Sequence, residues 1–140
     1  MTRKQTTPHA GAVKPDERPG ALAGGDLLDA PGPFQSTGIQ SIAAERQRQF
    51  EKEGWTPEHD DTHSNGEMAG AAACYAMQAT LDGIERNDLI QTVRSAIRNL
   101  WPWANHWWKP KTRRADLVRA GALIAAEIDR LDRLEKGGDA

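Results

Sequence analysis

Two histidines and three of four carboxylates are candidate ligands in the short stretch GWTPEHDDTHSNGE, residues 54–67. They are His59, Asp60, Asp61, His63 and Glu67. Carboxylate oxygens suit Mg²⁺ or Mn²⁺, and histidine nitrogens also bind Mn²⁺, iron or Zn²⁺. The spacing matches neither the H-E-x-x-H nor the paired C-x-x-C zinc pattern. The stretch therefore indicates either a metal or phosphate site, or a solvated polar turn that opens at Thr56-Pro57.

Asp116 and Glu127 form a second candidate group. They are eleven residues apart in a segment of clear helical periodicity, and eleven steps of about 100° return to nearly the same side of a helix. Leu123, Leu131 and Leu134 lie on or beside that side, so we expect it to face the core. An unpaired buried carboxylate is costly, and the partner is either an arginine in a structural ion pair or a divalent cation.

Four of the five tryptophans lie between residues 101 and 108, in the stretch WPWANHWWKP. The two prolines favour a packed irregular loop over a helix interior. The tryptophans either plug one end of a helical bundle, or bury in a dimer interface, or stack on a nucleotide base while neighbouring basic residues hold its phosphates. The nucleotide-binding set would be Trp103, His106, Trp107, Trp108, Lys109, Lys111 and Arg113.

The length, net charge and composition of the chain limit the class of protein. The 140 residues predict one domain, and a net charge of −2 with a pI of about 6.1 makes nucleic-acid binding unlikely as a main function. Cys74 is the single cysteine, so an intramolecular disulfide is excluded, and its alanine-rich surroundings predict a small core residue. No apolar run reaches the roughly 20 residues of a membrane span, and no signal peptide is evident. We therefore predict a cytoplasmic protein without a membrane partner.

The elements that must position these residues are helices. Residues 1–38 are rich in glycine and proline and predict a disordered tail, followed by a helical domain at 39–136 and a C-terminal tail at 137–140. The predicted helices are Ser41–Glu53, Glu67–Leu81, Asp88–Leu100 and a long one that Thr112 caps and Gly137-Gly138 ends. No strand pattern competes, so the fold class is all-α, a small bundle of about four helices.

Caps and apolar faces refine this prediction. Ser41 is the expected N-cap of the first helix, and Ser64 with Glu67 forms an S-x-x-E capping box for the second. Ile42 and Phe50 give the first helix a narrow apolar stripe toward the core. The third helix has one apolar face, made by Leu89, Val93, Ala96, Ile97 and Leu100.

Three stretches resemble a family of small uncharacterised proteins of bacteriophages and prophages. They are ERQRQFEKEGWTPEHDDTHSNGEMAGAAACYA, then WPW and WWKP, then DLVRAGALIAAEIDRLDR. The resemblance covers roughly Ile42 to Arg133 and implies a phage or prophage origin. It brings no established activity.

The order of helices is also similar to some MazG-like proteins. That resemblance implies an all-α nucleoside triphosphate pyrophosphohydrolase, with Mg²⁺ held by carboxylates on facing helices. The usual signature is E-x-x-E on one helix and E-x-x-D on the next. Here Gly70 stands where Glu67 would need a second acid, and Arg113 precedes Asp116, so half of each pair is missing. His59, Asp60 and Asp61 are then the candidates to complete the site.

Three functions follow as alternatives. In the first, Glu67, Asp116 and Glu127 hold Mg²⁺ or Mn²⁺, the loop acids and His59 position the attacking water, and a nucleoside triphosphate is hydrolysed. In the second, the same aromatic and basic residues bind or sequester a nucleotide or nucleotide signal without cleaving it. In the third, the protein is a helical protein–protein interaction module with exposed tryptophans as hot spots. A homodimer is compatible with each.

Overall fold

The computed structural model describes residues 36–139, so the predicted tail at 1–38 lies almost wholly outside the described residues. The helices are α3 (Thr37–Glu53), α4 (Pro57–Asp60), α5 (Glu67–Thr80), α6 (Asn87–Leu100) and α7 (Arg113–Asp139), with 3₁₀ turns η3 (Leu81–Gly83) and η4 (Asn105–Trp107). Since none of these residues is in a strand, the all-α prediction is confirmed. Within the same range, no helix is long and apolar enough to cross a membrane.

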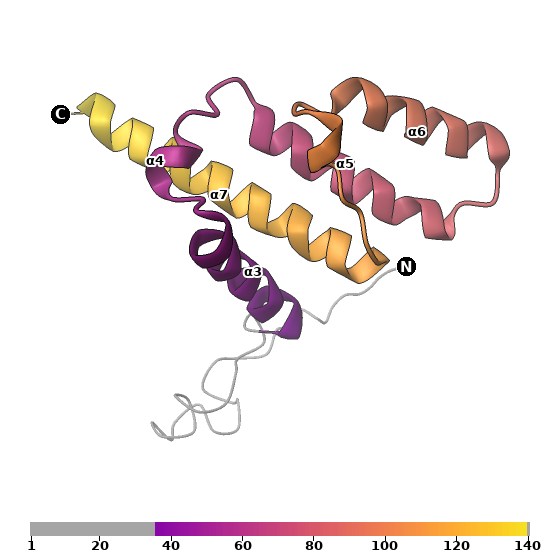
Figure 1. Cartoon of the computed structure of the whole chain (residues 1–140), viewed down its shortest axis with the longest axis horizontal. Helices are drawn as coiled ribbons and strands as arrows, with labels where there is room; N and C mark the ends of the chain where they lie inside the picture. The colour runs from indigo at the N-terminus through magenta and orange to yellow at the C-terminus, as the bar shows by residue number, and fades with distance from the viewer. Residues whose placement is uncertain (1–35, 140) are drawn as a thin grey trace, which may run out of the picture. The chain divides into compact units, whose positions relative to one another are not determined.

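The core lies between α5 and α7, which run side by side in opposite directions (Figure 1). Arg119 of α7 reaches Tyr75 in the middle of α5, and Arg113 at the start of α7 lies beside Gly83, just past the end of α5. Short side chains let the two backbones approach closely. The buried cluster consists of Met68, Ala71, Ala72, Tyr75, Ala120, Leu123 and Ala126.

Helix α6 packs against α5, where small residues again allow close contact. A Cβ at Gly70 would lie 3.7 Å from the carbonyl oxygen of Leu100. Ile97 is buried, and the Cys74 thiol lies 3.7 Å from its carbonyl oxygen. Cys74 is fully buried, which confirms the prediction of a core residue, and burial raises the pKa of its thiol.

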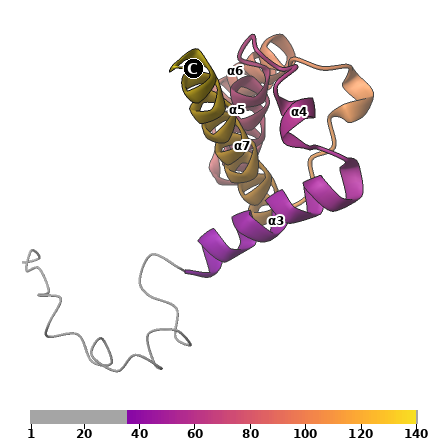
Figure 2. The same ribbon diagram turned by 90° about the vertical axis from the view of Figure 1, so that its left-hand side faces the viewer.

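Helix α3 crosses α7 at Gly121 (Figure 2). A Cβ at Gly121 would lie 2.5 Å from the Cδ1 atom of Ile42, so only glycine allows this approach without a shift. Two polar contacts hold the crossing: Arg114 donates to the Ser41 hydroxyl at 2.8 Å, and Arg46 pairs with Asp129 at 3.3 Å. The crossing fixes the position of the end of α3, which leads into the polar loop (residues 54–66).

The polar loop begins with the short helix α4. The Thr56 hydroxyl caps it by accepting from the backbone N–H of His59 at 3.2 Å, and Pro57 occupies the first turn. Arg133 of α7 fastens the loop by donating to the carbonyl of Pro57 and to the carboxylate of Asp61, at 3.2 and 2.7 Å. The predicted helical turn at Thr56-Pro57 is confirmed.

Two predicted caps are wrong. Helix α3 begins at Thr37, so Ser41 lies inside the helix, where its hydroxyl accepts from Arg114. Helix α5 begins after Gly66, whose φ of 81° turns the chain into the helix without a side-chain cap. The Glu67 carboxylate accepts from the backbone N–H of Asn65 at 2.6 Å and does not form the box with Ser64.

The predicted end of the last helix is also wrong, because α7 continues through Gly137 to Asp139. A glycine in a helix costs only about 1 kcal/mol relative to alanine, which is too little to terminate a long helix alone. The proposed tail at 137–140 therefore begins as helix, and only residue 140 lies outside the described range. The cap at Thr112 is confirmed, since its hydroxyl accepts from the Ala115 N–H at 3.1 Å.

Several side chains expected in the core are exposed. Phe50 is 48% exposed, and Gln49 beside it is buried instead. Leu131 and Leu134 are 47% and 62% exposed, because α5 begins opposite Arg130 and the end of α7 extends beyond it. On α6, Ile97 is buried and Leu89 and Leu100 are exposed. The apolar faces are therefore narrower than helical spacing predicts.

Candidate functional site

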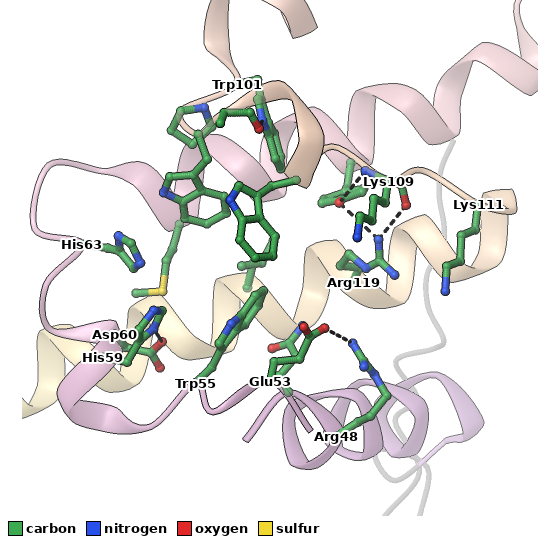
Figure 3. Close-up of a pocket in the computed structure, with 18 residues that line it drawn as sticks. Arg48, Glu53, Trp55, His59, Asp60, His63, Trp101, Lys109, Lys111 and Arg119 are labelled. Atoms are coloured by element: carbon green, nitrogen blue, oxygen red, sulfur yellow. Dashed lines mark hydrogen bonds and ion pairs between the residues drawn. The ribbon is translucent and has the colours of Figure 1, made fainter. Parts of the chain in front are cut away.

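A pocket of about 760 Å³ opens between α3, the polar loop, the tryptophan loop (residues 101–111) and α7 (Figure 3). Its volume falls in the range of small-molecule sites. Side chains from all four segments line it, together with Met68 and Tyr75 of α5, so the fold brings together residues from Arg48 to Leu123. This pocket contains the two clusters that the sequence singled out.

A chain of aromatic rings joins the polar loop to the tryptophan loop. Its members in order are Trp55, His59, His63, Trp103, Trp101, Trp108 and Tyr75. The contact between the two loops is that of His63 with Trp103, whose ring centroids lie 5.2 Å apart. The chain starts with Trp55 stacked on His59 at an interplanar angle of 7°. Flat apolar faces therefore border the pocket on the side of both loops.

One end of the pocket is cationic. Arg119 donates to the Tyr75 hydroxyl and to the carbonyl of Lys109, at 3.1 and 2.8 Å, and lies 5.0 Å from the centre of the Tyr75 ring. The ammonium of Lys109 lies 5.8 Å from the Trp107 ring, and Lys111 follows two residues on. Across residues 36–139, neither these lysines nor Arg119 forms a salt bridge with a carboxylate. The Glu45 carboxylate still feels Arg119, whose attraction is among the causes that lower the pKa of Glu45 after the hydrogen bond from Arg48, whereas in the same range no such interaction is recorded for the two lysines.

The other end contains His59, Asp60 and His63, which Figure 3 shows across the pocket from Lys109, Lys111 and Arg119. Asp60 is 2% exposed, and its Oδ2 atom accepts no hydrogen bond from the described residues. The nearest cation is Arg46, with 3.6 Å between its Nη1 atom and Oδ2. Burial raises the pKa of Asp60, and the attraction of Arg46 only partly opposes that shift.

Two further buried polar atoms of the pocket lack a partner. They are the Oε1 atom of Gln49 and the indole Nε1 of Trp103. The amide nitrogen of Gln49 donates to Glu45 at 3.0 Å, which leaves the oxygen as a free acceptor. With Asp60, three of the four such atoms in residues 36–139 belong to residues that line this pocket. Unsatisfied buried groups cost about 1–3 kcal/mol each, so their concentration here favours a ligand with matching donors and an acceptor.

Of the three predicted metal ligands, Asp116 lies far from Glu127, and each of the three acids has another contact. Glu67 is held by the N–H of Asn65, which lowers the pKa of its carboxyl. Asp116 is buried and accepts from the backbone N–H of Lys111 at 2.8 Å. Glu127 pairs with Arg130 through two contacts of 2.8 and 3.0 Å. Eleven residues at 1.5 Å rise separate the last two acids by about 16 Å, too far to share an ion.

These contacts correspond to the structural-ion-pair alternative for Glu127 and to a capping role for Asp116. In the described part of the chain, no group of three or more His, Cys, Asp or Glu side chains is placed to hold a metal ion. The role of Mg²⁺ or Mn²⁺ stays a prediction. The Asp116 contact ties the tryptophan loop to the start of α7 and thereby positions Lys109 and Lys111.

Six of the remaining predicted site residues line the pocket: His59, Asp60, Trp103, Trp107, Lys109 and Lys111. The others do not line it. Asp61 pairs with Arg133, His106 lies against Trp107 at 4.9 Å, and Arg113 lies beside Gly83. Trp108 packs behind the pocket against Tyr75, with ring centroids 4.7 Å apart.

Sequence reasoning missed several pocket residues, chiefly Arg48, Gln49, Trp55, Tyr75 and Arg119. A signal existed for two of them. Arg119 is a charged residue on the face of α7 that also carries Leu123, and Tyr75 is the one aromatic residue of an alanine-rich helix. Polar groups on an apolar helix face generally need a partner, and here each supplies it to the other. Gln49 gave no comparable signal.

Comparisons of the chain with protein-family models, with curated proteins and with solved structures gave no significant match in any of the three. The resemblances to a phage protein family and to MazG-like proteins are thus neither supported nor contradicted, and they stay predictions.

Proposed function

We propose that the protein binds a nucleotide, or a closely related ligand that joins an aromatic ring to phosphate, in the pocket of Figure 3. The observation that carries this proposal is the division of one pocket into a cationic end and an end with aromatic rings and orphaned polar atoms. Nucleotides have the same division, with an anionic phosphate chain and a flat base that carries hydrogen-bonding groups.

The cationic end would hold the phosphates. Lys109, Lys111 and Arg119 reach the pocket from the tryptophan loop and from α7. Arg119 is oriented by its bonds to Tyr75 and to the Lys109 carbonyl, so little side-chain entropy is lost when it meets a phosphate. Charge-assisted hydrogen bonds of this kind are about twice as strong as neutral ones.

The opposite end would hold the base. Aromatic stacking is worth about 1–3 kcal/mol per base, and Trp55 and Trp103 line the pocket beside His59 and His63. The free acceptors of Gln49 and Asp60 suit N–H donors, and the indole N–H of Trp103 suits an acceptor. A guanine edge offers a carbonyl oxygen beside two N–H donors, so we expect guanine to be preferred over adenine.

Binding without cleavage is the function that these contacts favour. The groups suited to hold a ligand converge on the pocket, whereas Glu67, Asp116 and Glu127 are engaged elsewhere. Metal-dependent pyrophosphate release from a nucleoside triphosphate stays the alternative, and product analysis decides it. An interaction module with tryptophan hot spots has less support, because Trp107 is the one exposed member of the five. A homodimer stays a prediction that the pocket itself does not require.

The test is a calorimetric titration of the full chain with nucleotides, first without added metal and then with Mg²⁺ or Mn²⁺. Lys111→Ala should weaken binding, since an exposed lysine of the cationic end is lost with little effect on the fold. Lys136→Ala, an equally exposed lysine near the end of α7, is the matched control and should bind as the native protein does. Equal affinities of the two variants would argue against phosphate at this end.

Recovery of the ligand after denaturation separates binding from hydrolysis. The proposal predicts that the nucleotide returns unaltered and in stoichiometric amount, with and without Mn²⁺. Release of pyrophosphate and a monophosphate would instead establish the enzymatic alternative. If the protein binds no nucleotide at all, both the binding proposal and the enzymatic alternative are wrong.

A further inference from the structure

The end of α3 forms one wall of the pocket and places a carboxylate there. Glu53 is the last residue of α3, it lines the pocket, and its side chain is 35% exposed. A negative charge at this end of a helix is unfavourable, because the C-terminal end is the negative pole of the helix dipole. A carboxylate close to a phosphate site also repels the phosphate. Glu53 therefore opposes two electrostatic effects, and a ligand group that donates hydrogen bonds to it would offset them.

Glu53 lies between the two ends of the pocket. Figure 3 shows it between Trp55, on the side of the aromatic rings, and Arg119, at the cationic end. The chain order agrees on the first side, since Trp55 follows two residues after Glu53. On the other side, Arg48 joins Glu53 to Glu45, a carboxylate that also feels the charge of Arg119. The sugar of a nucleotide joins its base to its phosphates, so Glu53 is placed where the sugar of the proposed ligand would lie.

The Glu53 carboxylate has acceptor sites left for a ligand. Within residues 36–139, Arg48 is the one cation paired with it, with 3.1 Å between the Nη2 atom of Arg48 and the Oε2 atom of Glu53. An ionised carboxylate has about four acceptor sites and donates no hydrogen bond, so it suits O–H groups and rejects phosphate. The two neighbouring hydroxyls of ribose are a pair of such donors. A deoxyribose has only one of them.

We propose that Glu53 binds the ribose hydroxyls of the ligand and thereby selects ribonucleotides over deoxyribonucleotides. This inference rests on the proposed function, because it places the sugar between the base and the phosphates of that same ligand. Arg48 donates to Glu45 at 2.8 Å and to Glu53 at 3.1 Å, so it orients the Glu53 carboxylate before the ligand binds. A carboxylate that accepts from the 2′-hydroxyl of ribose also occurs in dinucleotide-binding folds, where it selects the sugar by the same chemistry.

Calorimetric titration of the full chain with guanosine triphosphate and with 2′-deoxyguanosine triphosphate tests the sugar contact. The native chain should bind the ribonucleotide about tenfold more tightly, which is the effect of one hydrogen bond to a charged group. Glu53→Ala should bind the two with equal affinity. Glu51→Ala is the matched control and should keep the preference, since Glu51 is exposed on the same turn of α3 and does not line the pocket. The ratio compares two ligands on one protein, so a change of charge that affects both cancels.

Inorganic triphosphate separates a sugar contact from an effect of Glu53 on Arg48. Glu53→Ala removes a negative charge and no donor to phosphate, so it should bind triphosphate at least as tightly as the native chain does. Weaker binding of triphosphate would show that Glu53 acts on the phosphates through Arg48, and would overturn the assignment.

Two results with the nucleotides would overturn it as well: equal affinity of the native chain for the ribonucleotide and the deoxyribonucleotide, or a preference that persists in Glu53→Ala. In either case the nucleotide still binds, so the proposed function stands. If neither nucleotide binds the native chain, the proposed function fails and this inference fails with it. Circular dichroism confirms that each variant is folded.

Discussion

Replacing Asp60 with asparagine should stabilise the folded protein and weaken ligand binding. The Oδ2 atom is buried without a donor, and Arg46 is 3.6 Å away. An unsatisfied buried polar group costs about 1–3 kcal/mol. Asparagine removes the charge but also the attraction to Arg46, which keeps its contact with Asp129 at 3.3 Å. We expect a net gain of about 1 kcal/mol, or roughly 4–8 °C in the melting temperature of a domain of this size.

The gain should depend on pH in a defined direction. Burial raises the pKa of Asp60 above its usual 3.8, so the folded protein binds this proton more tightly than the unfolded chain. Stability of the native protein therefore falls as the pH rises from 3.8 through the raised pKa, and the full cost is present above it. Asparagine does not titrate. The advantage of Asp60→Asn should be complete at neutral pH and should disappear as the pH falls through the raised pKa.

Thermal unfolding of both proteins at several pH values measures this difference. Carboxyls with a lowered pKa, such as those of Glu45 and Glu67, make stability rise with pH instead. Both proteins contain these carboxyls, so their contribution cancels in the difference between the two. Asp61→Asn is the control, since it loses the 2.7 Å contact with Arg133 at an exposed position and should gain no stability. An Asp60→Asn protein that is less stable at neutral pH would refute the reasoning and show that the pair with Arg46 outweighs burial. If Asp60→Asn loses binding and gains stability, Asp60 contributes to ligand binding at a cost in the stability of the fold.

Three further predictions concern packing, the acid of α7 and the base. Gly121→Val should cost about 1–3 kcal/mol because its side chain meets Ile42, whereas Gly137→Ala has free space and should gain up to about 1 kcal/mol; denaturant titration compares them. Glu127→Gln should destabilise the fold by leaving the Arg130 guanidinium without a carboxylate, equally with and without Mn²⁺. A loss seen only with Mn²⁺ would support the metal role. Guanosine phosphates should bind about tenfold more tightly than adenosine phosphates, a difference of about 1.4 kcal/mol by calorimetry. Equal affinities would disprove the base assignment and leave the pocket proposal in place.

The helices could be predicted because the spacing of apolar residues and the residues that end a helix can be recognised within a short stretch of sequence. Gly54, with a φ of 73°, ends α3 as predicted, and Thr112 caps α7. The capping box was wrong because Ser64 and Gly66 compete for the same turn, and glycine takes the left-handed conformation at lower cost. Helix faces were less predictable, since burial depends on where a neighbouring helix ends, as at Leu131.

The site could be predicted only in part. The two clusters are visible as unusual composition, but their contact through His63 and Trp103 depends on how α5 and α7 pack. Asp116 and Glu127 were grouped by their angle around one helix, and this angle takes no account of the rise along the helix. The two acids share a side and still lie about 16 Å apart. Orphaned atoms such as that of Gln49 have no sequence signature, because they are defined by what surrounds them.

Calorimetry with the whole ligand and its two parts tests the two-ended pocket most directly. The full chain would be titrated with guanosine triphosphate, with guanosine and with inorganic triphosphate, each without added metal. If the cationic and aromatic ends act on one ligand, the nucleotide should bind much more tightly than either part, and Lys111→Ala should remove most of the difference between nucleotide and nucleoside. Triphosphate that binds as tightly as the nucleotide, or no heat with any of the three, would contradict the proposed function.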